Sequence, residues 1–151
     1  MHCFEFQSRF ACSPAEMFAL HEDVGIFRRL IPPWERVEIL DLPASLQPGT
    51  RALLRLRWGP LSILWEAVHC EYDPPRCFSD EQARGPFACW RHRHVMEPAD
   101  GGCVLRDEVD YRLPLHPLTA WLCPLVDRRL RRMFAFRHRV TGELLAARRE
   151  V

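Results

Sequence analysis

The spacing of apolar residues changes once along this chain, and this change constrains the fold more than any other feature. Up to residue 113, apolar and polar side chains mostly alternate within short segments, and pairs such as Gly59-Pro60 and Pro74-Pro75 separate these segments. Alternation is typical of strands with one buried face. From Leu118 onward, apolar residues recur every three or four positions, as in an amphipathic helix. We therefore expect an antiparallel sheet whose apolar face is covered by one long helix.

Turn signals and capping signals divide the chain into elements. The segment Ser13-Pro14-Ala15-Glu16 has the pattern of a capping box with proline at the first helical position, and it predicts a short helix to about Glu22. One or two further helical turns are expected over 24–30, ended by Ile31-Pro32-Pro33. A break in the long helix is expected near Pro124. The predicted strands are 2–12, a strand around 37–39, 54–58, 62–72, 77–83, 87–97 and 103–113.

Size and composition exclude several classes of protein. A chain of 151 residues with 48% apolar and 27% charged residues is expected to form one globular domain. No apolar run approaches the ~20 residues of a membrane span, and Glu5 and Arg9 argue against a secretion signal. The net charge of +1 does not favour nucleic-acid binding. The seven cysteines lack a C-x-x-C pair, which favours free thiols in the cytoplasm over disulfides or structural zinc.

A row of polar residues is predicted on the inward face of the sheet. Strand parity turns His92 and His94 inward on 87–97, and it turns Asp107 inward on 103–113. Hairpin register then places His69 opposite Asp80, Asp80 opposite His92, and either His92 or His94 opposite Asp107. Adjacent strands lie ~4.8 Å apart, so these side chains are expected to be neighbours.

The long helix contributes a charged residue to the same space. Arg137 falls on the apolar stripe between Met133 and Val140, and a buried arginine is costly unless it is paired. We expect its guanidinium to reach Asp107 or a carboxylate of a bound ligand. Glu35 is expected at the rim of the same space.

The polar row has three interpretations that the sequence leaves open. The row is either a buried network that fixes strand register, a set of groups that orients a ligand, or a set of catalytic residues. No metal or cofactor is expected, because a straight row of donors does not close on one ion at bond lengths of ~2 Å. Only an adjacent pair such as His92 with Asp80, joined by a third donor, meets that geometry. No nucleotide-binding or hydrolase motif occurs.

Five segments resemble the START-like, or SRPBCC, superfamily, and specifically a subfamily of small stand-alone bacterial proteins described as ligand-binding or cyclase/dehydrase-like. They are RLIPPWE (29–35), WEAVH (65–69), FSDEQARGPFACWRHRH (78–94), DEVDYRLP (107–114) and RRMFAFRH (131–138). The resemblance implies one α+β helix-grip domain over 1–151. In that fold a curved antiparallel sheet of six to seven strands wraps around a long C-terminal helix, and two short helices follow the first strand. It also implies a cavity between sheet and helix, but no particular ligand and no catalytic residues.

The leading hypothesis is a non-enzymatic module that binds an apolar small molecule, lipid-like or polyketide-like, with a polar or carboxylate end. One alternative is a cyclase or dehydratase with His92 as base and Asp80 or Asp107 orienting it. Another is a protein-binding regulator. The expected ligand-binding residues are His69, Asp80, His92, His94, Asp107, Arg137, Trp58, Trp65, Trp90, Tyr111 and Met133, and further apolar walls are expected from Phe4, Phe6, Leu54, Leu56 and Phe134.

The segment DRRLRRMFAFRHR (127–139) gives the long helix a basic outer face. A charge run of this kind is usually a solvated surface. A transient contact with an anionic membrane or with another protein is the alternative. Nucleic acid is not favoured, because the inner half of the helix must cover the sheet. The residues concerned are Arg128, Arg131, Arg132 and Arg139.

Overall fold

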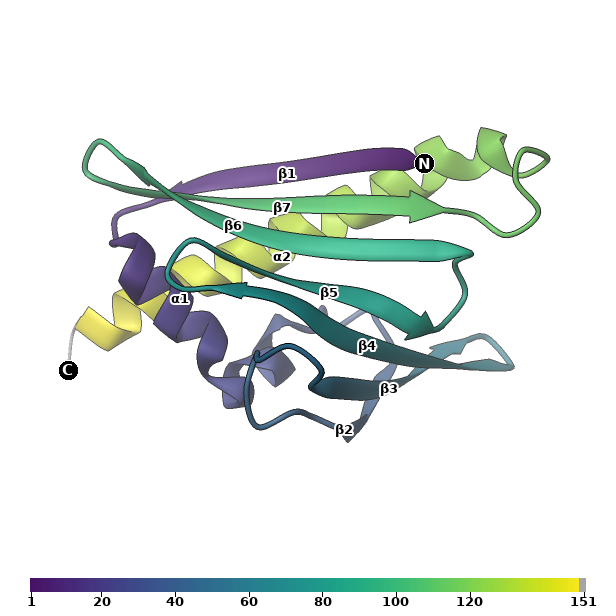
Figure 1. Ribbon diagram of the computed structural model, residues 1–151, viewed down its shortest axis with the longest axis horizontal. Helices are drawn as coiled ribbons and strands as arrows, with labels where there is room; N and C mark the ends of the chain where they lie inside the picture. The colour runs from purple at the N-terminus through teal and green to yellow at the C-terminus, as the bar shows by residue number, and fades with distance from the viewer. Residues whose placement is uncertain (150–151) are drawn as a thin grey trace.

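A computed structural model describes residues 1–149 and contains a seven-stranded antiparallel sheet with one long helix (Figure 1). After the first strand come a short α-helix and a 3₁₀ helix, and a second 3₁₀ segment precedes the long helix. The elements are β1 (His2–Phe10), α1 (Pro14–Glu22), η1 (Val24–Leu30), β2 (Val37–Asp41), β3 (Arg51–Trp58), β4 (Leu61–Asp73), β5 (Cys77–Arg84), β6 (Cys89–Ala99), β7 (Gly102–Arg112), η2 (Ala120–Leu122) and α2 (Cys123–Arg149).

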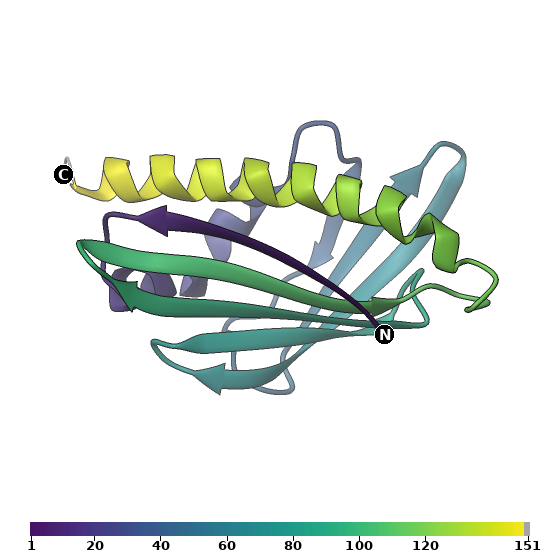
Figure 2. The same ribbon diagram turned by 90° about the horizontal axis from the view of Figure 1, so that it is seen from above.

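The sheet order is β1-β7-β6-β5-β4-β3-β2. Strands β2 to β7 form a meander, and β1 returns to pair with β7, so α1 and η1 carry the chain from one edge of the sheet to the other. The sheet is curved, and α2 runs lengthwise over one of its faces (Figure 2). The predicted helix-grip architecture is confirmed, with seven strands.

The start of α2 differs from its prediction. The helix begins at Cys123, and Leu118 lies in the preceding turn, where its side chain is exposed. Pro124 is tolerated because the first turn of a helix leaves its backbone N–H groups without helical partners. The break expected near Pro124 is therefore the beginning of the helix.

The predicted capping box of α1 is present. The backbone N–H of Glu16 donates to Ser13 Oγ at 3.2 Å, and the backbone N–H of Ser13 donates to Glu16 Oε2 at 2.7 Å. Pro14 occupies the first turn. This cap fixes the direction in which α1 leaves β1, and it turns Met17 and Leu20 into the core.

The buried core consists of two apolar clusters that follow one another along α2. The first packs α1 against β6, β7 and the C-terminal half of α2, and it contains Leu105 and Val140. The second packs β1, β6 and β7 against the N-terminal half of α2, and it contains Val109 and Phe134. On β7, Asp107 lies between Leu105 and Val109, so the polar residues occupy the boundary between the clusters.

The β2–β4 part of the sheet is less covered than the rest. The inward side chains of Leu54, Leu56, Ile63 and Trp65 are half-buried, whereas those of β7 are buried. Within residues 1–149, no helix is long and apolar enough to cross a membrane.

Candidate functional site

Asp107 is the centre of a buried group of histidines. Its side chain is 3% exposed, and Oδ1 lies 2.7 Å from His92 Nε2 while Oδ2 lies 2.6 Å from His138 Nε2. An ionised carboxylate only accepts hydrogen bonds, so both histidines donate from Nε2. His94 Nδ1 is 2.8 Å from Oδ1, but the ring is not aligned for a hydrogen bond. Strands β6 and β7 and helix α2 all contribute to this group.

The register predicted for the polar row is observed. His69 pairs with Asp80, Asp80 pairs with His92, and His94, the second of the two alternatives, pairs with Asp107. His92 Nδ1 lies 3.7 Å from Asp80 Oδ2. His69 lies at the end of the row and its Nδ1 is 3.0 Å from the hydroxyl oxygen of Thr50.

The helix residue that meets Asp107 is His138, and the expected ion pair between Asp107 and Arg137 is absent among the described residues. His138 follows Phe134 by four positions, so both side chains lie on one helix face. His138 Nδ1 also lies 2.8 Å from Ser8 Oγ of β1. The spacing from Phe134 was the sequence signal that could have identified His138.

Arg137 nevertheless points inward. Its Nε is buried and has no hydrogen-bond partner among residues 1–149, and its guanidinium carbon lies 5.8 Å from the centroid of the Phe134 ring. Burial lowers the pKa of Arg137, and the carboxylates of Asp107, Asp80 and Glu35 oppose that fall. Glu35, expected at the rim, pairs with Arg129 at 2.6 Å.

Burial controls the charge of the group. It lowers the pKa of His94 to about 4, and the neighbouring His92 adds to this effect. It raises the pKa of the Asp80 carboxyl, although the nearby His94 opposes the rise. Burial also raises the pKa of Asp107, but His94 and the hydrogen bonds from His138 and His92 more than offset it and hold that pKa well below its usual range. The site therefore combines an ionised Asp107 with a neutral His94 at neutral pH.

A further histidine, His21 of α1, was not predicted. Its ring centroid lies 5.6 Å from that of His94, and Nδ1 lies 2.9 Å from the Met17 carbonyl oxygen. Burial, together with the neighbouring His94, lowers the pKa of His21 to about 4. Phe78 stacks on the His94 ring at 4.2 Å, and its ring centroid lies 5.8 Å from that of His21.

The aromatic residues expected to line a cavity divide into three groups. Trp65 and Trp90 pack edge to face at 5.2 Å on the inward face. Tyr111 is fully buried, and its single hydroxyl hydrogen is shared between the Cys123 carbonyl oxygen at 3.1 Å and Asp127 Oδ1 at 2.9 Å, so Tyr111 anchors the start of α2. Trp58, expected as a wall, is 65% exposed at the end of β3.

The remaining expected wall residues lie at the interface of sheet and helix. Phe4 and Phe134 are buried, whereas Phe6 and Met133 are partly buried against the same apolar cluster.

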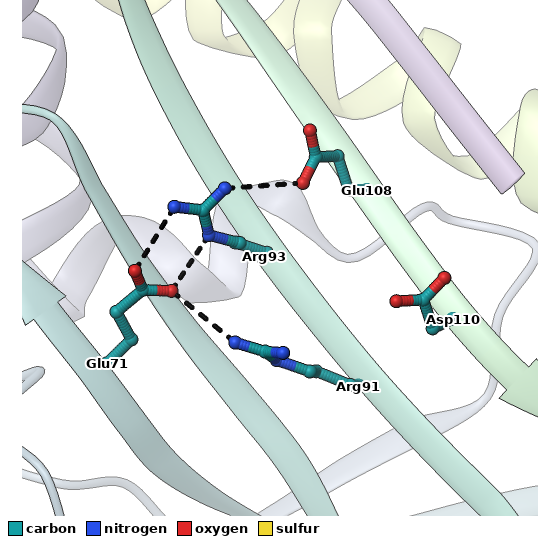
Figure 3. Close-up of a pocket in the computed structure, with 5 residues that line it drawn as sticks. All are labelled: Glu71, Arg91, Arg93, Glu108 and Asp110. Atoms are coloured by element: carbon teal, nitrogen blue, oxygen red, sulfur yellow. Dashed lines mark hydrogen bonds and ion pairs between the residues drawn. The ribbon is translucent and has the colours of Figure 1, made fainter. Parts of the chain in front are cut away.

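Two hollows differ in their position relative to the sheet and α2. One encloses about 250 Å³ on the outer face of the sheet and is lined by Glu71, Arg91, Arg93, Glu108 and Asp110 (Figure 3). The other encloses about 150 Å³ near the start of α2 and includes His2, Tyr111 and Cys123. The interior of the β1, β6 and β7 part is filled by the aromatic core. The accessible inward surface is the half-buried part on β3 and β4.

Residues 11–138 match the model of the family described as polyketide cyclase / dehydrase and lipid transport. The chain belongs to this family. No curated protein sequence matches the chain. Membership of the polyketide cyclase / dehydrase and lipid transport family supports ligand binding or cyclase-type function in general, and it does not identify a substrate.

Solved structures agree with the family assignment. The protein TTHA0849 from Thermus thermophilus has a TM-score of 0.74 at 15% identity, with 97% of this chain and 98% of that chain covered. Norcoclaurine synthase from Thalictrum flavum, in complex with dopamine and hydroxybenzaldehyde, has a TM-score of 0.72 at 13% identity, with coverages of 97% and 87%.

A nucleoside-diphosphate sugar epimerase from Corynebacterium glutamicum has a TM-score of 0.71 at 23% identity, with 93% of this chain and 28% of that chain covered. At these identities the neighbours show a shared fold, and with the family match they confirm the SRPBCC resemblance.

Proposed function

We propose that this protein binds an apolar small molecule with an anionic end, and that Arg137 pairs with that end. The observation that supports the proposal best is the buried Nε of Arg137, which has no partner among the described residues. Arg137 is half-buried, and its buried Nε–H is unfavourable without an acceptor; a ligand carboxylate can accept from Nε and a neighbouring N–H group in bidentate geometry. No ion pair joins Asp107 to Arg137 among the described residues, and the Asp107 oxygens accept hydrogen bonds from His92 and His138.

The apolar part of the ligand has a matching surface. The inward residues Leu54, Leu56, Ile63 and Trp65 are half-buried, and they lie on the part of the sheet next to the polar row. Covering such surface contributes about 25 cal/mol per Å² of apolar area, before the costs of association. An apolar chain with a carboxylate at one end therefore suits this arrangement.

The test compares dodecanoic acid with its methyl ester, with binding followed by tryptophan fluorescence. A hydrogen bond to a charged group contributes about 1.5–3 kcal/mol. Arg137→Ala is therefore expected to weaken binding of the acid by roughly 10–100-fold and to leave binding of the ester nearly unchanged. Arg139→Ala is the matched control, because Arg139 is exposed and pairs with Glu143 at 2.6 Å. An equal loss of affinity for the acid and for the ester in Arg137→Ala would contradict the proposed pairing of Arg137 with a ligand carboxylate.

An enzyme of the cyclase or dehydratase type is the second candidate. It is supported by the proximity of His92 Nδ1 to Asp80 Oδ2, at 3.7 Å, and by the raised pKa of the Asp80 carboxyl in its buried position. These groups form a donor and acceptor pair suited to moving a proton at a carbonyl substrate. Native mass spectrometry followed by solvent extraction distinguishes the two candidates, since a carried molecule is recovered unchanged.

We also propose that one end of the molecule docks on an anionic membrane. Exposed apolar side chains gather in the segment between β7 and α2 and at the tip of the β3–β4 hairpin, which lie at the same end of the molecule (Figure 1). Arg128 follows on the exposed side of α2. The exposed apolar residues of these segments are Trp58, Leu61, Leu115, Leu118, Trp121 and Leu125.

Most of the basic residues of α2 that were expected to contact a membrane or a protein have partners within the chain. Arg131 lies over the Phe4 ring at 5.5 Å, Arg132 lies over the Trp34 ring at 4.1 Å, and Arg139 pairs with Glu143. Of these four arginines, Arg128 is the nearest in sequence to the exposed Leu125, and the adjacent Arg129 lies over the Trp58 ring at 5.2 Å. Apolar insertion is therefore the main source of the proposed membrane affinity, and the arginines add electrostatic attraction.

A further inference from the structure

We infer that Asp80, His92 and His94 form a binding site for one divalent transition-metal ion of the zinc or iron type. Each residue offers one ligand atom, and the three atoms lie within 4.8 Å of one another. The site goes beyond the proposed function, since neither ligand carriage nor membrane docking requires a metal.

The backbone arrangement makes a triangle of these donors rather than a line. Asp80 and His92 are opposite each other on β5 and β6, and His94 is the next inward residue along β6. The third donor that the straight row lacked is therefore supplied by the same strand as the second. Their side chains are 17%, 6% and 14% exposed, so the site is buried and still reachable.

The distances need only side-chain adjustment to close on an ion. A tetrahedral ion with bonds of about 2.0–2.2 Å holds its ligand atoms roughly 3.4 Å apart. His92 Nδ1 and Asp80 Oδ2 are already 3.7 Å apart. No two ligand atoms of the triangle are more than 4.8 Å apart, and a change of rotamer angle covers the remaining difference from the required value.

The surrounding residues orient His92 as a ligand. Its Nε2–H donates to Asp107 Oδ1 at 2.7 Å, which leaves the lone pair on Nδ1 and directs it toward Asp80. Metal-binding histidines usually donate their other ring N–H to a carboxylate in this way. Asp107 is itself held by His138 at 2.6 Å, so the support extends into α2.

His94 carries a buried ring atom that a metal ion would satisfy. Its Nδ1 has no hydrogen-bond partner among residues 1–149, although Asp107 Oδ1 is 2.8 Å away. An ion either takes the Nδ1 lone pair directly, or binds Nε2 and lets Nδ1–H turn toward Asp107. Both arrangements remove the unsatisfied atom.

The donor set and the charge select the class of ion. Two imidazoles and one carboxylate suit zinc or iron, whereas magnesium and calcium prefer oxygen ligands alone. The thiol of Cys77, on β5, contacts Glu71 and Arg93 on the outer face, so it does not join the set. Asp80 and Asp107 bring two carboxylates to this region and Arg137 brings one guanidinium. The remaining net negative charge favours a divalent cation. Three protein ligands leave at least one coordination position open.

The experiment uses the full chain after treatment with a chelator and dialysis, without any organic ligand. Zn²⁺ binding is measured by calorimetry, and Co²⁺ binding by its visible absorption. We expect one ion per chain. Loss of a supporting carboxylate costs about 10–100-fold in affinity, so His94→Gln and Asp80→Asn, which remove direct ligands, are expected to weaken binding by at least that factor.

The matched control is His69→Gln, because His69 is the inward neighbour of Asp80 on β4 and lies outside the triangle. This variant is expected to keep the wild-type affinity. Circular dichroism identifies any variant that fails to fold. The Co²⁺ spectrum of the wild-type protein then tests the site by itself, since histidine nitrogens at four-coordinate Co²⁺ give intense visible bands.

Absence of Co²⁺ bands and of stoichiometric Zn²⁺ binding in the folded wild-type protein would overturn the inference, as would unchanged affinity in both folded ligand variants. Arg137→Ala is expected to bind Zn²⁺ at least as tightly as the wild type, because it removes a positive charge near the site. Failure of the metal site is thereby distinguished from failure of the proposed carboxylate pairing.

Discussion

Asp107 shows how one residue type shapes the interior of this protein. A buried aspartate is costly in an apolar core unless its oxygens are hydrogen-bonded. Here His92 and His138 supply those bonds from opposite layers, one from the sheet and one from α2. The carboxylate is therefore a structural link between the layers as well as the support of the proposed metal ligand.

The variant Asp107→Asn tests this structural role. An amide offers N–H groups where His92 or His138 already donates, so at least one buried pair is lost, at a cost of about 1–3 kcal/mol. The free energy of unfolding from urea titration, measured with chelator present, is expected to fall by that amount. Asp110→Asn, on the outer face of the same strand, is expected to stay within about 0.5 kcal/mol. Equal stability of wild type and Asp107→Asn would contradict the link.

Strand parity was sufficient to place five members of the polar row, because side chains alternate strictly between the faces of a sheet. On the helix, the periodicity of the sequence did not identify the inward polar residue in the same way. Adjacent helical residues are only about 100° apart, so Arg137 and His138 both border the apolar stripe, and the charged residue was chosen as the partner of Asp107. His21 had no periodic signal, because α1 is nine residues long.

At the scale of elements, strands β4, β6 and β7 present charged residues on the face opposite α2 (Figure 3). Arg93 of β6 binds Glu71 of β4 through Nε at 2.8 Å, and its Nη1 lies 3.5 Å from Glu108 of β7. Arg93 and Glu108 are opposite each other on neighbouring strands, where opposite charges stabilise one register, whereas the Glu71–Arg93 pair reaches across β5. They also make the outer face of the sheet polar.

The Glu71–Arg93 pair gives stability a pH dependence. The hydrogen bond from Arg93 lowers the pKa of Glu71 below its ordinary value of 4.5. The stabilisation is therefore present in full above pH 4.5 and is lost as the pH falls through the pKa of the folded state. Because Glu71 is about a third exposed, Glu71→Gln is expected to cost up to about 1 kcal/mol at pH 7.

Urea titrations at pH 7 and at pH 3 check this expectation, with Glu5→Gln on the exposed face of β1 as the control. The difference between wild type and Glu71→Gln is expected to shrink at pH 3. A difference of the same size at both pH values would show that charge is not its source.

The elements were more predictable from sequence than their ends. Alternation and turn residues located the strands to within a few positions, and the Ser13–Glu16 capping box located α1. The start of α2 was misplaced because Leu118 and Leu122 continue the helical spacing of apolar residues into η2 and the preceding turn. Pro124 prevents this continuation, because it has no N–H for the Ala120 carbonyl oxygen and its ring clashes with that carbonyl, so α2 begins only at Cys123.

At the scale of the whole molecule, exposed apolar side chains are distributed unevenly. Leu115, Leu118 and Trp121 are 76–78% exposed in the segment before α2. Exposed apolar clusters next to basic residues are typical of surfaces that meet membranes. The overall net charge is only +1, so the position of docking depends on the local distribution of charged and apolar side chains.

Vesicle co-sedimentation tests the proposed docking. The protein is expected to bind vesicles that contain phosphatidylglycerol more strongly than vesicles of phosphatidylcholine alone, and less strongly at high salt. Trp121→Ala combined with Leu118→Ser is expected to reduce binding severalfold, because it removes the apolar groups that would insert. Leu40→Ser on β2 is the control. Retained binding in the double variant, or equal binding to both kinds of vesicle, would contradict membrane docking at this end.

Two of the polar contacts between α2 and the sheet have a consequence for the position of the helix along its axis. Asp127 meets the Tyr111 hydroxyl at 2.9 Å, and His138 meets Asp107 at 2.6 Å. The two helix residues are about three turns apart. An apolar stripe repeats along a helix, so it tolerates a slip of one turn, about 5.4 Å. Such a slip separates both polar pairs at once, and α2 is thereby confined to a single longitudinal register.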